Sequence, residues 1–292
     1  MPSLDDLKKR IKSVKSTQKI TKAMKMVAAA KLRKAQDNAE KGRPYSQKMQ
    51  NIILNLTNSI NDPQNAPKLL VGNGNDKTYL CLVLTADRGL CGGFNSNICK
   101  LAKINFKKIL NEGKELKIIT VGSKGLDQIK REYGKYVIKK FSFKDTKQIT
   151  FTEAEIIGSE IINLFNNNEF DKCILFYNNF KNVITQIPQA QQIIPAEKKQ
   201  SAEDNKGVLA YEFEPDEDEI LEDLLPKNIS TQVFKAFLEN AASEQGSRMT
   251  AMDNATRNAG DLVDKLTINY NRSRQASITK ELIEIISGAE SL

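Results

Sequence analysis

The residues best placed for chemistry lie in one glycine-rich loop, DRGLCGGFN, which runs from Asp87 to Asn95. An apolar run precedes the loop and a segment of helical character follows it, so its backbone N–H groups could meet a phosphate at a helix N-terminus. However, the loop does not match G-x-G-x-x-G, and no G-K-S/T follows it. The later run GSKG, Gly122 to Gly125, also falls short of a Walker loop. A tight strand-to-helix turn, which needs small residues, explains the loop better than a nucleotide site does.

Other reactive groups give weaker signals. The carboxylates of Asp216 to Asp223 lack the glycine and ligand spacing of an EF-hand, and a favourable helix start explains them better. No C-x-x-C pair occurs among Cys81, Cys91, Cys99 and Cys173, which favours reduced thiols packed as small apolar groups. The chain has no histidine, so histidine-based triads and metal sites are excluded. The sequence predicts no catalytic residue, no metal site and no cofactor.

The longest predicted element is a helix at the end of the chain, from Asn228 to Leu292, a stretch without proline. A stripe of positions four and three residues apart runs along it, which is the period of a coiled coil, and the stripe is poor in large apolar residues. This stripe comprises Phe234, Leu238, Ala241, Gln245, Arg248, Met252, Ala255, Ala259, Leu262, Leu266, Asn269, Ser273 and Ala276. A helix of about sixty residues is roughly 90 Å long, and so small an apolar face needs a closely packed partner.

The partner is predicted at the other end of the chain, where residues 3–60 form a second long helix with Ser3 as its N-cap and Asp6 three positions later. Its stripe comprises Leu4, Leu7, Ile11, Val14, Gln18, Thr21, Ala28, Leu32, Ala35 and Ala39, with Ile20, Met24 and Val27 displaced from it. Gly42 and Pro44 predict a bend or break, because proline removes a helical hydrogen bond. Two long helices at opposite ends of one chain pair most simply in an antiparallel coiled coil.

Between these helices, apolar strand-like segments alternate with amphipathic helical ones. Strands are expected at residues 78–84, 116–121, 136–140 and 172–177, with an edge strand at 183–194 and a further strand at 208–213. Helices are expected at 95–110, 124–131 and 152–165. The alternation predicts a Rossmann-like α/β lobe with a mainly parallel sheet. The predicted organisation is therefore a helix at 1–60, a linker at 61–77, an α/β domain at 78–213, a short acidic helix at 214–226 and a helix at 227–292.

Positive charge gathers at the start of the chain, where residues 1–43 carry thirteen Lys and Arg against four Asp and Glu. Five lysines share one helix face: Lys8, Lys12, Lys15, Lys19 and Lys22. The alternatives are a solvated face, an acidic protein partner, nucleic acid or anionic lipid. Tyr45 is the only aromatic residue among the first seventy, which leaves little for base stacking and favours a protein partner. No apolar run is long enough to predict a membrane span, and no targeting segment is expected.

Several runs along the whole chain resemble one family, the gamma subunits of F-type ATP synthases. The resemblance is carried by TQKITKAMKMVAAAKLRKAQ from Thr17 to Gln36, by RPY at 43–45, by the loop at 87–95, and by SEQGSRMTAM from Ser243 to Met252. The ending ITKELIEIISGAES, Ile278 to Ser291, fits the family's C-terminal signature. Matching runs with so many fixed positions make the resemblance highly specific.

The resemblance implies a rotor shaft of a proton-translocating ATP synthase, a non-catalytic subunit on the cytoplasmic face of a bacterial inner membrane. Three alpha and three beta subunits would surround the paired helices, and epsilon and the membrane c-ring would meet the lobe. It also implies partner contacts at Met24, Arg248, Arg274, Gln275, Thr279, Glu281, Ile285 and Ile286. The lysine face would add attraction to acidic beta surfaces.

Two other functions remain open at this level. An α/β nucleotide-binding enzyme with helical arms would bind or hydrolyse ATP alone and would depend on Gly92 and Gly93. A basic coiled-coil protein that binds nucleic acid would show salt-sensitive DNA binding through the lysine face. The shaft interpretation predicts neither.

Overall fold

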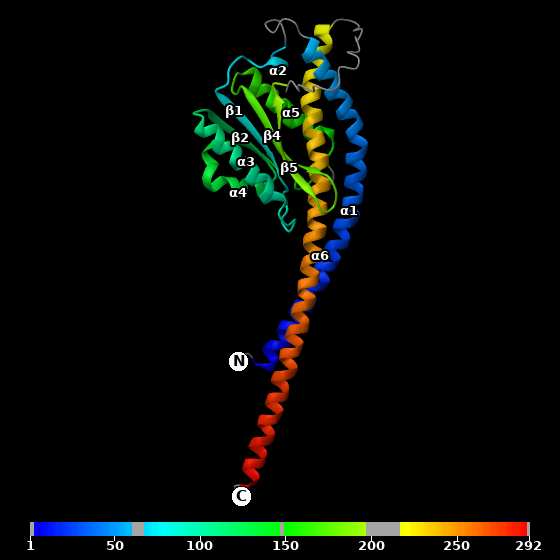
Figure 1. Cartoon of the computed structure of the whole chain (residues 1–292), viewed down its shortest axis with the longest axis vertical. Coiled ribbons are helices and arrows are strands. Elements are labelled where there is room, and N and C mark those ends of the chain that lie inside the picture. Colours follow the sequence, from blue (N-terminus) through cyan, green and yellow to red (C-terminus); the bar gives the residue numbers. More distant parts are fainter. Residues whose placement is uncertain (1–2, 60–66, 147–148, 197–216, 291–292) are drawn as a thin grey trace. The chain divides into compact units, whose positions relative to one another are not determined.

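The computed structural model describes residues 3–59, 67–146, 149–196 and 217–290. It divides into two compact units, Met1–Ala30 with Arg248–Leu292 and Lys31–Ser247. Two long helices, α1 (Leu4–Ser59) and α6 (Glu217–Glu290), contribute to both units (Figure 1). The predicted strand at 208–213 lies outside the described residues.

The start of α1 is fixed by the predicted cap. The backbone N–H of Asp6 donates to the Ser3 hydroxyl over 3.1 Å, and the backbone N–H of Ser3 donates to the Asp6 carboxylate over 3.3 Å. These reciprocal bonds satisfy donors that the first helical turn leaves unpaired. The predicted N-cap is confirmed.

Neither proline interrupts its helix. Of the bend or break predicted at Gly42 and Pro44, the break is wrong, because α1 continues through Pro44. The predicted separation at Pro226 is also wrong, because α6 continues through it and no separate acidic helix ends before the terminal one. Each proline removes one backbone hydrogen bond. Burial on both sides offsets that loss in α6, where Leu225 and Ile229 flank the proline and are 4% and 2% exposed. Tertiary packing of a helix face contributes more to its stability than one ladder bond does.

Within the first unit, α1 and α6 pack antiparallel. The Thr256 hydroxyl donates to the Thr21 hydroxyl over 2.8 Å, and further along α1 Lys25 forms an ion pair with the earlier residue Asp253. Among the residues of this unit that the structure describes, those buried are Leu7, Thr21, Ala28, Met252, Ala259 and Val263. The α1 stripe is confirmed at its buried positions. The α6 stripe is wrong at Leu262, which is 46% exposed while its neighbour Val263 is buried.

Within the second unit, the same two helices also meet. Ile53 of α1 and Leu225 of α6 share a buried cluster with Leu70. Leu70 belongs to α2 (Lys68–Val71), a single helical turn inside the predicted linker. Earlier in α1, a Cβ added at Gly42 would lie 2.8 Å from the Leu238 side chain of α6. The glycine therefore leaves room for the Leu238 side chain, which a larger residue at position 42 would have to displace.

The lobe of the second unit is built on a five-stranded sheet with the order β3-β2-β1-β4-β5. Strands β1 (Thr78–Leu84), β2 (Glu115–Val121), β3 (Val137–Phe141) and β4 (Lys172–Phe180) run parallel, and β5 (Gln186–Ile194) is antiparallel to β4. The prediction of a mainly parallel sheet with an edge hairpin is confirmed. Strands β1, β2 and β4 are buried over most of their length, as expected for parallel strands covered on both faces.

Helices cover both faces of this sheet (Figure 1). Tyr79, Cys81 and Val83 of β1 face α3 (Phe94–Asn111) and α4 (Ser123–Tyr133), which leads into a short 3-10 turn at Gly134–Tyr136. The alternate residues Leu80, Leu82 and Leu84 face α5 (Phe151–Asn166) and α6. This alternation is the two-residue period of a strand.

A second face of α6 packs against the sheet. Ile229, Val233, Ala236 and Phe237 are buried in the core cluster of β1, β4 and α5. The coiled-coil stripe predicted here assumes a contact between two helices, and it is wrong at Phe234, which packs against this cluster with its ring edge-on to Phe151 of α5. Over this part α6 is a core helix of the lobe.

A charged cluster supports the amino ends of the parallel strands. Asp76 accepts hydrogen bonds from Lys114 and Lys172, each over 2.9 Å, and from the Tyr79 hydroxyl over 2.7 Å. Burial alone would raise the pKa of the Asp76 carboxyl, but these donors together hold its pKa well below its ordinary value of 3.8. The cluster joins the start of β1 to β4 and to the residue before β2.

We expect Asp76→Asn to destabilise the lobe at neutral pH, because both lysines lose their shared carboxylate. The lowered folded-state pKa means that the contribution is complete above the ordinary value of 3.8 and is lost as the pH falls through the folded-state pKa. Urea unfolding followed by circular dichroism should show a difference from wild type that shrinks between about pH 5 and about pH 2. Asp127→Asn, at an exposed i,i+3 pair with Lys124, is the control. A difference for Asp76→Asn that does not change with pH would contradict this account.

Candidate functional site: exposed helix surfaces

The glycine-rich loop uses its polar groups to hold the fold. The Asp87 carboxylate accepts hydrogen bonds from the Ser123 backbone N–H and the Ser142 hydroxyl, each over 2.8 Å, and from the Phe143 backbone N–H over 3.1 Å. It thereby joins the segments that follow β1, β2 and β3. Leu90 and Gly92 have φ of 61° and 55°, as a tight turn requires. The loop fits the structural explanation that the sequence favoured.

The crevice where doubly wound folds bind nucleotides is occupied here by α6. The strand order changes direction between β1 and β4, and ligands usually bind beyond the carboxyl ends of such strands. At this point Asn240 of α6 donates to the Leu84 carbonyl over 3.1 Å and accepts from the Asn178 backbone N–H over 2.8 Å. One buried side-chain amide thus bridges the two strands. The enzyme alternative loses its most favourable site.

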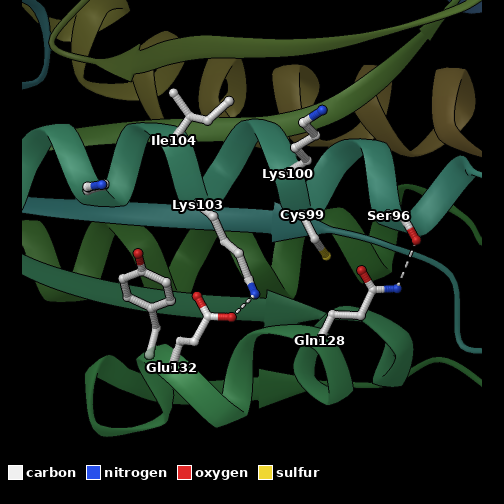
Figure 2. A pocket seen from close by; sticks show the side chains of 9 residues that line it. Ser96, Cys99, Lys100, Lys103, Ile104, Gln128 and Glu132 are labelled. Atoms are coloured by element: carbon white, nitrogen blue, oxygen red, sulfur yellow. Dashed lines mark hydrogen bonds and ion pairs between the residues drawn. The ribbon is translucent and has the colours of Figure 1, made fainter.

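A shallow groove of about 390 Å³ lies between α3 and α4 (Figure 2). Two side-chain pairs cross it, Lys103 with Glu132 at 2.6 Å and Gln128 with Ser96 at 3.4 Å. The thiol of Cys99 also lines the groove, and burial raises its pKa to about 11. The groove therefore offers a neutral thiol and paired charges, which is no arrangement for nucleophilic catalysis.

The cysteine prediction is confirmed, since all four cysteines are buried as thiols. Burial raises the pKa of the Cys81 and Cys173 thiols well above their ordinary value.

Among the described residues, no group of histidine, cysteine or acidic side chains is arranged to hold a metal ion. Within the same ranges, no helix is long and apolar enough to cross a membrane.

The predicted basic face is exposed on the α1 portion of the first unit. All five of its lysines, Lys8, Lys12, Lys15, Lys19 and Lys22, are exposed. Near them α1 also exposes apolar side chains: Ile20, Met26 and Val27 are 57%, 66% and 56% exposed. Met24, which the resemblance named, is half-buried. Large apolar side chains beside a row of lysines form a surface suited to a protein partner.

Toward its end α6 loses its covering neighbours, and over residues 278–287 every side chain is exposed. From Asp264 to Ser287 no side chain that the structure describes is buried, although Ile278, Leu282, Ile285 and Ile286 are apolar. Ile285 and Ile286 are 67% and 58% exposed. A helix that carries apolar side chains without a covering neighbour lacks the burial that usually stabilises it.

The other predicted contact residues are spread along α6 and do not form one site. Arg274, Gln275, Thr279 and Glu281 are exposed near its end. Two of these side chains bond within the helix: the Thr279 hydroxyl donates to the Gln275 carbonyl over 3.0 Å, and Glu281 accepts from the Ser277 hydroxyl over 3.4 Å. Arg248 is half-buried and is the first residue of α6 that belongs to the first unit. The structure presents a long series of surfaces rather than a pocket.

Sequence reasoning missed the polar residues that join α6 to the sheet. Asn240 and Ser243 are buried, and Ser243 donates to the Asn178 carbonyl over 3.3 Å. The run LENAAS placed polar residues within a helix, but their burial depends on contacts distant in sequence. The class of protein is nonetheless clear: paired long helices expose basic and apolar surfaces, and an α/β lobe packs on one of them.

Comparison with known proteins identifies the family. The family model described as ATP synthase matches residues 3–292. The ATP synthase gamma chains of Pelagibacter ubique (strain HTCC1062) and Sinorhizobium medicae (strain WSM419) are 72% and 56% identical over 292 residues, covering all of both chains. The chain belongs to the ATP synthase gamma-chain family. As a member, it is a subunit of that complex and not its catalytic subunit.

Solved structures agree with this assignment. A chain of the Tetrahymena thermophila mitochondrial ATP synthase central stalk and c-ring is 27% identical, with a TM-score of 0.60 over 81% of this chain and 99% of that one. A chain of the Euglena gracilis OSCP/F1/c-ring assembly in rotational state 3 is 21% identical, with a TM-score of 0.67 over 99% and 94%. The second likeness shows the shared fold.

We expect Asn240→Ala to lower the free energy of unfolding by about 1–3 kcal/mol, because the buried Asn178 N–H and Leu84 carbonyl lose their partner. Urea denaturation measures this change, and Asn254→Ala, at an exposed position of the same helix, should have little effect.

Adding ATP should not raise the unfolding midpoint of the wild-type chain. Stabilisation by ATP would contradict the view that α6 occupies the nucleotide crevice.

Proposed function

We propose that the chain is the central rotor shaft of a proton-translocating F-type ATP synthase, which couples ion-driven rotation to conformational changes at the catalytic sites of beta subunits. The observation that carries this proposal is the exposed apolar end of α6, from Ile278 to Ile286, on a chain of the gamma family. Such a surface calls for a surrounding partner. Three alpha and three beta subunits around one copy of this chain would supply it.

Coupling requires that one shaft make different contacts with three otherwise alike subunits, since a ligand shifts an equilibrium only through differential affinity. The first unit has such an uneven circumference. One side of α1 carries the five lysines, whereas Ile20 and Val27 expose apolar surface. Turning the shaft would change which of these surfaces each beta subunit meets.

Individual contacts follow from the position of each side chain. We assign the lysine face to attraction toward acidic beta surfaces, which is screened by salt. Arg248, Arg274, Gln275, Thr279 and Glu281 would supply polar contacts with the ring, and Met24 an apolar one. Ile285 and Ile286 would turn inside an apolar sleeve, where non-directional contacts permit sliding.

The remaining parts of the complex concern the lobe. We assign residues 78–213 to contacts with epsilon and the membrane c-ring, and residues 1–60 and 227–292 to the shaft. The bacterial relatives support a peripheral position on the cytoplasmic face of the inner membrane.

Co-expression with alpha and beta subunits of a closely related bacterium tests the proposal. A particle with three alpha, three beta and one copy of this chain by native mass spectrometry, which hydrolyses ATP while the isolated chain does not, is the expected result. Failure to associate, or ATP turnover by the isolated chain, would reject the shaft function.

A double substitution tests the end of α6. Changing Ile285 and Ile286 to serine should weaken binding to the alpha–beta ring by roughly tenfold or more, because two apolar side chains no longer leave water. Titration of the ring with the chain measures this affinity. The unfolding midpoint of the isolated chain should not change, since both side chains are exposed. Ile184→Ser, at an 86% exposed position between β4 and β5, is the control. Equal affinity of the double variant and wild type would remove these residues from the bearing.

A further inference from the structure

Three elements of the second unit meet at the end of β4 through one buried carboxylate. Glu239 of α6 accepts two hydrogen bonds from Arg43 of α1, from Nε to Oε1 over 2.8 Å and from Nη2 to Oε2 over 3.1 Å. The same Oε2 accepts from the Phe180 backbone N–H over 3.0 Å. Arg43 also donates through Nη2 to the Phe180 carbonyl over 3.0 Å. We call this set, Arg43, Glu239 and Phe180, the clamp.

Burial makes the clamp stiff. The Glu239 side chain is only 4% exposed and that of Arg43 is 36% exposed. A bidentate pair between a guanidinium and a carboxylate has a fixed planar geometry, and hydrogen bonds weaken steeply when they are misaligned. In contrast, the apolar contacts of Val233 and Phe237 with the sheet are non-directional. The clamp therefore resists twisting of the helices on the sheet more than the apolar core does.

The clamp lies between the α/β lobe and the paired helices, where torque between them would be transmitted. Both α1 and α6 continue past the limits of the second unit at residues 31 and 247, whereas the sheet lies wholly within it. Contacts inside this unit join the lobe to α1 and α6, so torque applied to the lobe can reach the paired helices through them. Next to Glu239, Asn240 holds α6 to the sheet, but Arg43 brings α1 into the same attachment.

We infer that the Arg43–Glu239–Phe180 clamp is the joint that transmits torque between the α/β lobe and the paired helices, with Arg43 and Glu239 as positioning residues for coupling. This inference rests on the proposed shaft function. It requires more than an ion pair between two helices, because the strand backbone takes part as both donor and acceptor. Lysine at position 43 would keep the charge but lose the fork that reaches Glu239 and Phe180 together.

The test uses the assembled enzyme in membrane vesicles with Arg43→Lys and Glu239→Gln. We expect both variants to assemble and hydrolyse ATP while protons pumped per ATP, and ATP synthesis, fall by roughly fivefold or more. Native mass spectrometry confirms equal assembly. Glu160→Gln, which neutralises a pair between α5 and Lys139 inside the lobe, is the matched control and should keep the wild-type ratio.

A charge swap separates the clamp from a simple ion pair. Arg43→Glu combined with Glu239→Arg restores opposite charges between the helices but places the wrong groups against the Phe180 backbone, so we expect no recovery of coupling. Recovery by the swap, or a wild-type pumping ratio in both single variants, would overturn the inference. Failure of both conservative variants to assemble would also overturn it, since the pair would then be needed for folding alone. Loss of rotary coupling in the wild-type complex would instead reject the shaft function itself.

Discussion

The structure depends on the burial of α6 against the sheet and α1, because this burial holds one part of the helix while its end stays exposed. Over Leu225 to Phe237 the helix is buried by the sheet on one side and faces α1 on another. Around Met252 to Val263 it packs with α1, and beyond Asp264 none of its described side chains is buried. The stability of the exposed end must therefore come from helical continuity with the buried part. A helix that starts in a core can present an uncovered surface that would not fold as a separate segment.

The same helix also explains why a Rossmann-like sheet carries no nucleotide site in its usual crevice. Asn240 satisfies the backbone groups of β1 and β4 that a ligand would otherwise approach, and Asp87 uses its carboxylate to join three loops. The polar groups that suggest a reactive loop in the sequence are thus satisfied internally. The fold is shared with many enzymes, but the occupant of the crevice decides whether chemistry is possible there.

Much of this architecture could be predicted from sequence, because it is written in local periodicity. The strands and helices of the lobe follow alternation and amphipathicity, and the α1 stripe identifies Leu7, Ala28 and Leu32 as buried. The breaks predicted at the prolines were wrong because a lost backbone hydrogen bond can be read from the local sequence. The packing of Leu225 and Ile229 around Pro226 depends on residues distant in sequence and cannot be read there. The roles of Glu239 and Asn240 were hidden for the same reason. Their partners lie about 60 or more residues away in sequence, and only the folded chain brings them together.

The burial of the thiols has a consequence for how this chain responds to its environment. Histidine is absent, and all four cysteines are enclosed in the core. No exposed side chain of the described residues is thus of a type that ordinarily changes charge near neutrality. The electrostatic surface that the helices present should stay constant while the proton concentration around the complex rises and falls. Any sensitivity of such an assembly to pH near neutrality would then originate in the neighbouring subunits. The surface charge of this subunit would stay constant while ionisable groups of its neighbours gain or lose protons.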